Sequence, residues 1–422
     1  MTDPGAAALP DPARTASERT ISGGGAAGVG IASIVAAGCG YLVLLLAARS
    51  LDPARNADFL VFWSLLFGVF GVLGGVQSES TRASHAAESR SGGARILPWG
   101  LLLGGLAAVV VGATAPWWGE QVLGDAWIPG VVAVGLGAVL FAGHSAVAGI
   151  LAGQLRWGTY SVLVGAEAAT RLLLVVVVVL AGAATDQLEL AVAVAAGAWI
   201  VLAAISRPVR SVAGAVADVA APRLLANTGK AAVAAASSAA LVVGFPVLLR
   251  LTSGDVEFAD AAPLILAISV TRAPLLMPLA AYQGVAITHF MANRDRGLGA
   301  LSRVLVLITV LGAGAAVAAA LIGPWLLRLL FGDAYGVPGP VLAGLTLGAT
   351  ALAFLTMTGA AVLATGRHTV YALGWLAATT TSLALLFTPL SMEARAVLAL
   401  TIGPLVGIVI HAVAVQRSTR VA

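Results

Sequence analysis

Twelve apolar windows, each about as long as the 20 or so residues that a transmembrane helix needs, occupy most of the 422-residue chain. Only short polar segments separate them, and no connection is long enough to hold a large soluble domain. The windows lie near residues 21–48, 59–79, 96–116, 128–152, 159–184, 188–206, 228–250, 261–287, 304–324, 340–364, 370–388 and 396–415. The sequence therefore predicts an all-α, polytopic membrane protein with about 12 transmembrane helices.

The composition excludes several other classes of protein. Hydrophobic residues make up 59% of the chain and charged residues 10%, whereas soluble domains are about 45–50% apolar and about 25% charged. A disordered chain, a fibrous repeat and an ordinary soluble enzyme are therefore excluded. The single cysteine, Cys39, excludes an internal disulfide and a cysteine-based metal cluster. The net charge of +4 is too small to indicate nucleic acid as a partner.

The motifs of common enzyme classes are also absent from the sequence. It contains no GxxxxGKS or GxxxxGKT phosphate loop, no HExxH, no CxxC and no GxSxG. We therefore expect no enzymatic activity, no cofactor and no metal site. Without an ATPase motif, any uphill transport would use an ion gradient or a separate partner.

The basic residues alternate between the two sides of the predicted membrane. Of the 23 Lys and Arg residues, 16 lie in one set of loops and tails, 5 in the opposite set and 2 inside spans. The 5 are Arg49, Arg55, Arg250, Arg328 and Arg395, and the 2 inside spans are Arg171 and Arg272. Cytoplasmic loops carry the excess of basic residues. We therefore expect a multi-pass protein of the cytoplasmic membrane with both termini in the cytoplasm.

The polar segments divide the chain into five parts. Residues 1–20 are polar and rich in Pro and Ala, and predict a disordered cytoplasmic tail. Residues 21–206 and 228–415 form two lobes of six spans each, joined by a cytoplasmic linker over 207–227 and followed by a short tail over 416–422. The linker is amphipathic enough to lie on the membrane surface.

The two halves of the chain contain similar sequence motifs in the same order. Residues 116–127 (PWWGEQVLGDAW) match residues 324–335 (PWLLRLLFGDAY), and RWGTY at 156–160 matches RHTVY at 367–371. Because each half has six spans, both halves keep the same orientation, which predicts a parallel repeat about an axis along the membrane normal. Two lobes related in this way are a transporter layout, with the substrate site expected between them near the middle of the membrane.

Three charged residues lie deep in predicted spans, where an Arg costs about 2.5–3.5 kcal/mol and usually faces a bundle interior or an aqueous cavity. Glu167 and Arg171 share one face of the fifth span at i, i+4 spacing and can pair. They are either a self-neutralising pair or a coupling site in which Glu167 titrates. Arg272 in the eighth span is either an anion site in a central cavity or a packing residue bonded to a carbonyl. Pro274 and Pro278 follow it and break the helix.

Other polar side chains are weaker candidates. Gln77 and Arg82 lie at the cytoplasmic end of the second span, which is either the mouth of a cavity or an ordinary helix end at the headgroups. His144 in the fourth span is a lone imidazole that fits a satisfied core residue better than a proton relay. His289 is a weaker candidate still.

Three segments carry a resemblance to a known family: LLLAARSLDPARNADFLVFWSLL, AGQLRWGTYSVLVGAEAATRLLLVV and WLLRLLFGDAYGVPGPVLAGLTLGA. With them, the chain resembles the multidrug/oligosaccharidyl-lipid/polysaccharide (MOP) flippase superfamily, and within it the Wzx-type polysaccharide-export proteins of actinobacteria. The resemblance implies a V-shaped pair of six-helix bundles that alternate access to a cationic cavity.

The resemblance also implies a cargo and a binding site. The cargo is a polyprenyl-diphosphate-linked oligosaccharide, moved to the outer leaflet for cell-surface polysaccharide biosynthesis. Arg272 is similar to cavity arginines that hold the diphosphate; Arg82, Arg171 and Gln77 complete the expected substrate site, with Glu167–Arg171 as a charge pair that tunes it. Expected partners are the lipid-linked oligosaccharide and membrane lipids, with a glycan polymerase or glycosyltransferases as further candidates. The first span has no internal Arg, which disfavours a peptidoglycan precursor as cargo.

Two other functions remain open at this point. The first is a multidrug exporter of the same superfamily, coupled to protons or sodium, which would need carboxylates in its cavity. Glu167 is the only acid deep in a span, and the first and seventh spans have none. The second is a membrane subunit that scaffolds glycan-synthesis enzymes and transports nothing.

Overall fold

The computed structural model describes residues 23–87, 93–125, 127–182, 184–272, 275–276, 279, 299, 301–365 and 367–419. Several sequence-based expectations concern residues outside these ranges. They are the tail over 1–20, Pro274, Pro278, His289 and the second half of the eighth span.

Ten helices in the described residues are long and apolar enough to cross a membrane, and each matches one of the predicted windows. They are α2 (Gly23–Ser50), α3 (Pro53–Ala86), α4 (Ile96–Thr114), α6 (Trp127–Gly153), α7 (Trp157–Leu180), α8 with α9 (Thr185–Val194 and Ala198–Ile205), α15 (Ser302–Phe331), α16 (Gly339–Ala364), α17 (His368–Leu386) and α18 (Met392–Thr419). Apart from an isolated bridge between Arg95 and Val216, no extended pairing occurs in these ranges. The predicted all-α, polytopic fold is confirmed.

The seventh and eighth predicted spans are less regular. The seventh is a pair of helices, α11 (Ala221–Val242) and α12 (Phe245–Leu251), whose axes differ by 65°. The eighth begins as a helix over Ala262–Arg272. Short elements connect the spans: η2 (Ala115–Trp117), α5 (Gly119–Leu123), η3 (Ala195–Gly197), α10 (Arg207–Arg210), η4 (Ser211–Gly214), α13 (Asp255–Phe258) and η6 (Asp333–Tyr335).

The internal repeat predicted from sequence has a counterpart in the backbone. Arg156 and Arg367 precede α7 and α17 with nearly the same dihedral angles, φ −86° and ψ 58° against φ −90° and ψ 61°. Each carbonyl accepts a hydrogen bond from the Tyr four residues on, at 3.0 Å for Tyr160 and 3.1 Å for Tyr371. The two GDA motifs also begin alike, because Gly124 and Gly332 both have positive φ, which glycine adopts without steric cost.

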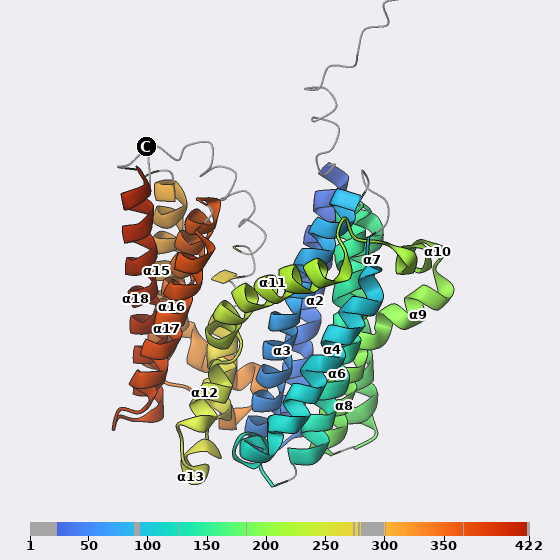
Figure 1. Cartoon of the computed structure of the whole chain (residues 1–422). Coiled ribbons are helices and arrows are strands. Elements are labelled where there is room, and N and C mark those ends of the chain that lie inside the picture. The colour runs from blue at the N-terminus through green and yellow to red at the C-terminus, as the bar shows by residue number, and fades with distance from the viewer. Residues whose placement is uncertain are drawn as a thin grey trace, which may run out of the picture.

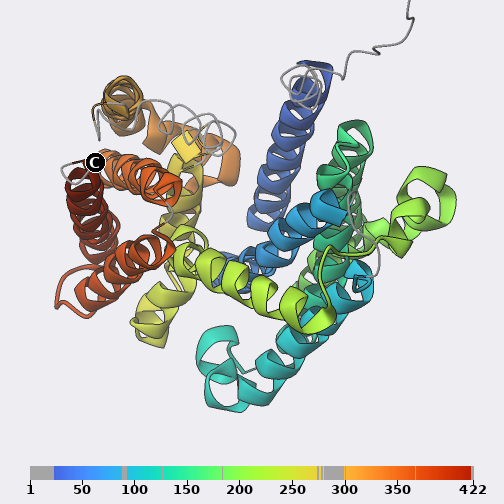
Figure 2. The same ribbon diagram turned by 45° about the horizontal axis from the view of Figure 1, so that its top comes forward.

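The helices form two bundles joined by α11. In Figure 1, α15 to α18 stand together on one side and α2 to α9 on the other, while α11 runs obliquely between them; Figure 2 shows the same separation from a second direction. Within the first bundle α3 and α4 pack on α6, and α2 packs on α7. Within the second, α18 packs on α16 and α17. Helix α11 lies along α3 and also reaches α17, so it touches both bundles.

Within the described residues, the core that the two bundles share lies toward one end. One buried apolar cluster includes Phe59 and Leu188 of the first bundle together with Phe331 and Leu342 of the second. Two further clusters belong to one bundle each, one around Ile150 and the other with members such as Met357. The bundles therefore meet at the end opposite the C-terminus and splay toward the end where the C-terminus lies (Figure 1).

Hydrogen bonds reinforce the end at which the bundles meet. Arg49, the next-to-last residue of α2, donates from Nε to the carbonyl of Leu330 at 2.7 Å and from Nη2 to that of Leu329 at 2.6 Å. It therefore caps the last turn of α15, where carbonyls have no helical donor. Close by in sequence, the buried amide of Asn56 donates to the hydroxyl of Tyr335 at 3.0 Å.

The segment between the lobes consists of two short helical elements and an extended stretch. After α10 and η4 it runs extended beside residues 94–96, with backbone bonds of 2.8–3.0 Å that include Ala217 N–H to Ala94 O. Helix α11 then begins at Ala221, earlier than the predicted window at 228. Pro222 in its first turn explains this start, because a proline there loses no intrahelical hydrogen bond.

The packing of α11 on α3 depends on one glycine. A Cβ added to Gly75 would lie 2.4 Å from Ala232 N and 2.6 Å from Ala232 Cα, whereas one added to the neighbouring Gly74 would meet nothing within 4 Å. Gly75→Ala should therefore destabilise the protein by about 1–3 kcal/mol through overpacking. Gly74→Ala should be neutral or slightly stabilising, because alanine favours a helix. Thermal unfolding of the detergent-solubilised variants checks both, and equal midpoints for the two would contradict the close approach.

Candidate functional site

A cavity of about 360 Å³ lies between the two bundles, beside the core that they share. Its wall comes from both bundles and from the α11–α12 bend. The lining residues are Ala36, Ala37, Gly40, Tyr41 and Leu44 of α2; Trp63, Ser64 and Phe67 of α3; Arg171 of α7; Val242, Val243 and Pro246 at the bend; and Ile268, Ser269, Arg272 and Leu276 of the eighth span. The two midplane arginines of the sequence, one from each lobe, thus face the same space.

The bend beside the cavity has a local cause. Helix α11 ends at Val242, and Pro246 in the first turn of α12 has no N–H to donate to the carbonyl of Val242. The N–H groups of Val243 and Gly244 both donate to the carbonyl of Ala239, at 2.9 and 3.0 Å. The last carbonyls of α11 therefore need donors from elsewhere, as at any helix end.

Arg272 supplies those donors. Its Nη1 donates to the carbonyl of Val242 at 2.9 Å and to that of Leu241 at 3.3 Å. Its guanidinium carbon lies 5.5 Å from the ring centre of Phe245, the first residue of α12. The side chain is 7% exposed and lines the cavity. One guanidinium therefore contacts both sides of the bend.

The other terminal nitrogen of Arg272 has no partner in the described part of the chain. Nη2 is buried, and no described residue accepts a hydrogen bond from it. Buried polar groups are nearly always satisfied, and each exception calls for an explanation. A donor of a charged group that is left over at the wall of a cavity is suited to an anion, which would accept the remaining N–H bonds.

Arg171 is held in a different way. It forms the expected ion pair with Glu167, four residues earlier in α7. Its guanidinium carbon lies 4.8 Å from the ring centre of Phe67 and 5.9 Å from that of Trp63, within the range of cation–π attraction. Its Nε has no partner among the described residues. The charge of Arg171 is thus partly compensated, while one donor remains unused.

Tyr41 is a site residue that the sequence analysis did not single out. Its hydroxyl donates to the carbonyl of Ser269 at 3.0 Å, a contact between the first and second bundles at the cavity wall. The sequence signal that could have identified it is a tyrosine inside the first apolar span. That signal is weak, because tyrosines also occur at membrane interfaces.

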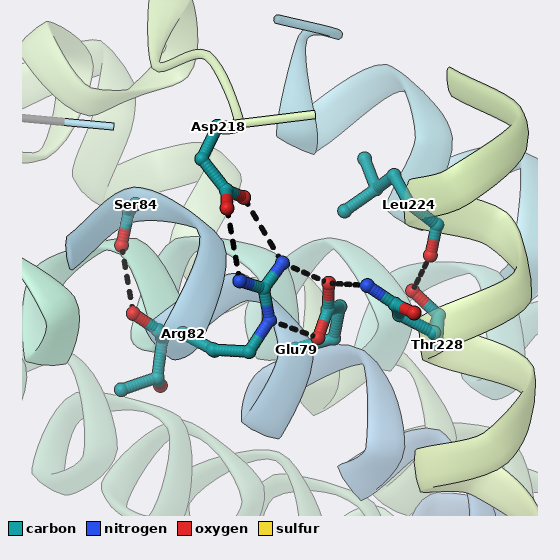
Figure 3. Close-up of polar contacts among 8 residues, drawn as sticks. Glu79, Arg82, Ser84, Asp218, Leu224 and Thr228 are labelled. Carbon is teal, nitrogen blue, oxygen red and sulfur yellow. Dashed lines mark hydrogen bonds and ion pairs between the residues drawn. The ribbon is translucent and has the colours of Figure 1, made fainter. Parts of the chain in front are cut away.

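Arg82 and Gln77 do not belong to the described wall of the cavity. Figure 3 shows Arg82 between two carboxylates: Glu79 on its own helix and Asp218 of the segment between the lobes. The four N–O distances are 2.7–3.0 Å. Gln77 instead donates to the hydroxyl of Tyr160 at 3.3 Å. The placement of Arg82 in a diphosphate site is therefore not supported by its position, because its charge already has two partners.

The Arg82 network holds the linker on the first bundle. Asn227, in the second turn of α11, donates to Glu79 at 3.1 Å, so the network reaches both ends of the segment from Asp218 to α11. The sequence could not show this, because the pairing of Arg82 and Asp218 spans 136 residues.

His144 lies deeper in the first bundle, away from the described cavity wall. It is buried, its ring stacks on Phe141 at 5.6 Å, and Nδ1 has no partner among the described residues. Within the same residues, no group of three His, Cys, Asp or Glu side chains is placed to hold a metal ion.

Comparison with known proteins gives the family of the chain. No family model matches it. The chain is 38% identical over 423 aligned residues to each of two uncharacterized proteins of Mycobacterium tuberculosis, Rv3630 and Rv1510. The alignments cover 99% of this chain, and 98% and 96% of those proteins. The chain therefore belongs to one family with these mycobacterial proteins.

Solved structures show which fold the family has. The inward-facing conformation of a multidrug resistance MATE family transporter of the MOP superfamily matches with a TM-score of 0.70 and 13% identity, over 91% of this chain and 98% of that one. A MOP superfamily transporter from Pyrococcus furiosus matches with a TM-score of 0.67 and 12% identity, over 93% and 95%; its binding pocket is described as having reverse polarity, suggesting a different function. The chain has the fold of MOP superfamily transporters.

The position of Arg82 leads to a prediction about the linker. Arg82→Ala should remove the ion pairs of Arg82 with Asp218 and Glu79, and should speed trypsin cleavage after Arg210 several-fold, since a more loosely held segment is cut faster. Binding of an anion in the cavity should change little. Arg55→Ala is the matched control, because Arg55 lies in the same helix in an exposed ion pair with Asp52 at 3.3 Å. Loss of anion binding in Arg82→Ala would place Arg82 in the binding site after all.

Proposed function

We propose that this protein is a transporter that flips a polyprenyl-diphosphate-linked oligosaccharide across the cytoplasmic membrane by alternating access of its central cavity. The observation that carries the proposal is the pair of arginines, one from each lobe, at the wall of a single cavity between the lobes. The MOP fold supports transport as the general activity.

The chemistry of the cavity favours an anionic cargo. Nη2 of Arg272 and Nε of Arg171 have no partner among the described residues, and none of the described lining residues carries a carboxylate. A diphosphate offers several oxygens that accept charge-assisted hydrogen bonds, and a guanidinium can bind such groups with two parallel bonds. Binding there would offset part of the hydration that the head group loses on entering the membrane.

The same observations disfavour an exporter of cationic drugs. That function would need an acid facing the cavity, and Glu167 is already paired with Arg171. The fold itself does not decide the question, because the neighbour from Pyrococcus furiosus is described as having a binding pocket of reverse polarity. The charge of the wall, rather than the fold, is therefore the argument for the cargo.

The conformation is also consistent with such a cycle. The bundles meet at the end away from the C-terminus and splay at the other end. With the orientation that the basic residues predict, the splayed end faces the cytoplasm, where lipid-linked oligosaccharides would be loaded. Membrane lipids would surround the protein, and a glycan polymerase or glycosyltransferases would act on the same cargo.

Replacing Arg272 tests the proposed binding site. Native mass spectrometry of the protein extracted gently from its own membrane should show a polyprenyl-diphosphate adduct on the wild type, and Arg272→Ala should lose it. Loss of a hydrogen bond to a charged group corresponds to at least about tenfold in affinity. Arg272→Lys should rescue only in part, because it keeps the charge but loses the bidentate geometry.

A matched control removes another buried arginine. Arg250 in α12 is 8% exposed but pairs with Asp255 at 2.7 Å and does not line the described cavity wall. Arg250→Ala should lower stability yet keep the adduct. An adduct that persists in Arg272→Ala and disappears in Arg250→Ala would overturn the proposed site.

Replacing Glu167 distinguishes the two cargo classes, because binding should change in opposite directions for an anion and for a cation. Glu167→Gln removes the negative partner of Arg171, so binding of farnesyl diphosphate should tighten several-fold as the potential of the cavity rises. For an exporter of cations the same variant should instead lose binding of a lipophilic cation such as tetraphenylphosphonium. Titrations of both probes against the wild type and Glu167→Gln measure this. If the wild type binds tetraphenylphosphonium more tightly than Glu167→Gln does, the result would favour the exporter.

A further inference from the structure

Arg272 has two tasks that use the same guanidinium. It donates to the carbonyls of Leu241 and Val242 at the end of α11, and it lines the cavity with a buried Nη2 that has no partner among the described residues. Its stacking on Phe245 adds a contact with α12 on the far side of the bend. The residue therefore sits where the cavity and the 65° bend meet.

We propose that an anion in the cavity and the carbonyls at the α11–α12 bend compete for Arg272, so that anion binding changes the angle between α11 and α12. This inference rests on the proposed function, because it requires that the cargo carries an anionic group. Arg272 acts on the bend as a positioning residue and on the cargo as a binding residue.

The competition follows from the geometry of a guanidinium. Two parallel bonds to a diphosphate use donors on two neighbouring nitrogens. Because Nη1 of Arg272 already donates to two carbonyls, bidentate binding through Nη1 and Nη2 must weaken those bonds. A phosphate oxygen is the stronger acceptor, since its negative charge attracts the guanidinium more strongly than a neutral carbonyl does inside the membrane.

The bend then loses the group that holds it. Pro246 cannot supply an N–H to Val242, so the carbonyls at the end of α11 depend on Arg272 or on water from the cavity. Buried carbonyls without a donor are costly. A different angle that opens them to cavity water is then favoured over the present one.

A change of angle at this point would act on both lobes. Before the bend, α11 lies on α3, and its start is tied to Glu79 through Asn227. After the bend, α12 packs against α3 and α5 at the end where the bundles meet. With α11 held at its first turns, the motion would pass to α12 and so to the closed end of the molecule.

The experiment measures the bend and binding in the same samples. Spin labels at Val233 of α11 and Val256 of α13, which are 67% and 90% exposed, report the distance across the bend in a Cys39→Ala background. The chain on each side of the bend reaches about 15 Å to its label. If the 65° bend straightened completely, the distance between the labels would lengthen by up to about 5 Å. The probe is farnesyl diphosphate, and farnesol is the control that lacks the anion.

We expect farnesyl diphosphate, but not farnesol, to shift the wild-type distance by a few ångströms. Arg272→Ala should give an altered distance that neither compound changes. A wild-type distance that stays constant while farnesyl diphosphate binds would overturn the coupling and leave the proposed function intact. Absence of any binding of farnesyl diphosphate to the wild type would instead count against both.

A second variant tests the competition from the side of the backbone. Pro246→Ala restores an N–H that can donate to Val242, so Arg272 is released and farnesyl diphosphate should bind about tenfold more tightly, the size of one hydrogen bond to a charged group. Pro222→Ala is the matched control in the same span, since a first-turn N–H has no helical acceptor. Equal affinity of Pro246→Ala and Pro222→Ala would contradict the competition. If Pro246→Ala does not fold, the probe-dependent distance in the wild type still decides.

Discussion

A guanidinium inside the hydrocarbon layer must find hydrogen-bond acceptors, an anion or an aromatic face, and the centre of this protein depends on how two arginines meet that requirement. Arg272 takes the carbonyls that the break before Pro246 leaves without donors. Arg171 takes Glu167 and the faces of Phe67 and Trp63. In each arginine one buried N–H donor has no partner within the described residues, and both side chains line the same cavity.

The arginines at the closed end behave differently, and the contrast explains the charge of the cavity. Arg49 caps α15, and Arg395 donates to the carbonyl of Leu386 and pairs with Glu257 at 2.6 Å. These are among the five basic residues that fall on the minority side of the positive-inside distribution. Arg395 is compensated by its carboxylate partner, and Arg49 is exposed at the end of its helix, whereas Arg272 is buried at the cavity wall and has no carboxylate partner among the described residues.

The sequence predicted the fold well because its strongest signal, the length of apolar windows, is set by the membrane itself. It also placed Glu167 and Arg171 on one helix face, since i, i+4 spacing is local. It could not show the ion pair of Arg82 with Asp218, because the two residues lie 136 positions apart. It could not tell which face of the eighth span Arg272 occupies, because every face is apolar. It also placed one unbroken span over 228–250, whereas the structure bends at residues 243–244, and the acceptors that the bend creates for Arg272 are a tertiary feature.

Two features, the incompletely paired arginines and the core that joins the bundles toward one end, bear on whether the protein transports a cargo or only scaffolds other proteins. A scaffold has no use for buried arginines at a cavity wall whose N–H donors are not all paired, since each lowers stability and can be lost at no functional cost. Nor does it need a core that joins two bundles at one end while each keeps its own at the other. Both features have a use in a molecule whose bundles part and rejoin around a charged cargo. The broken helix between them is then where binding and movement would be linked, because the group that stabilises the break is also the group that faces the cargo.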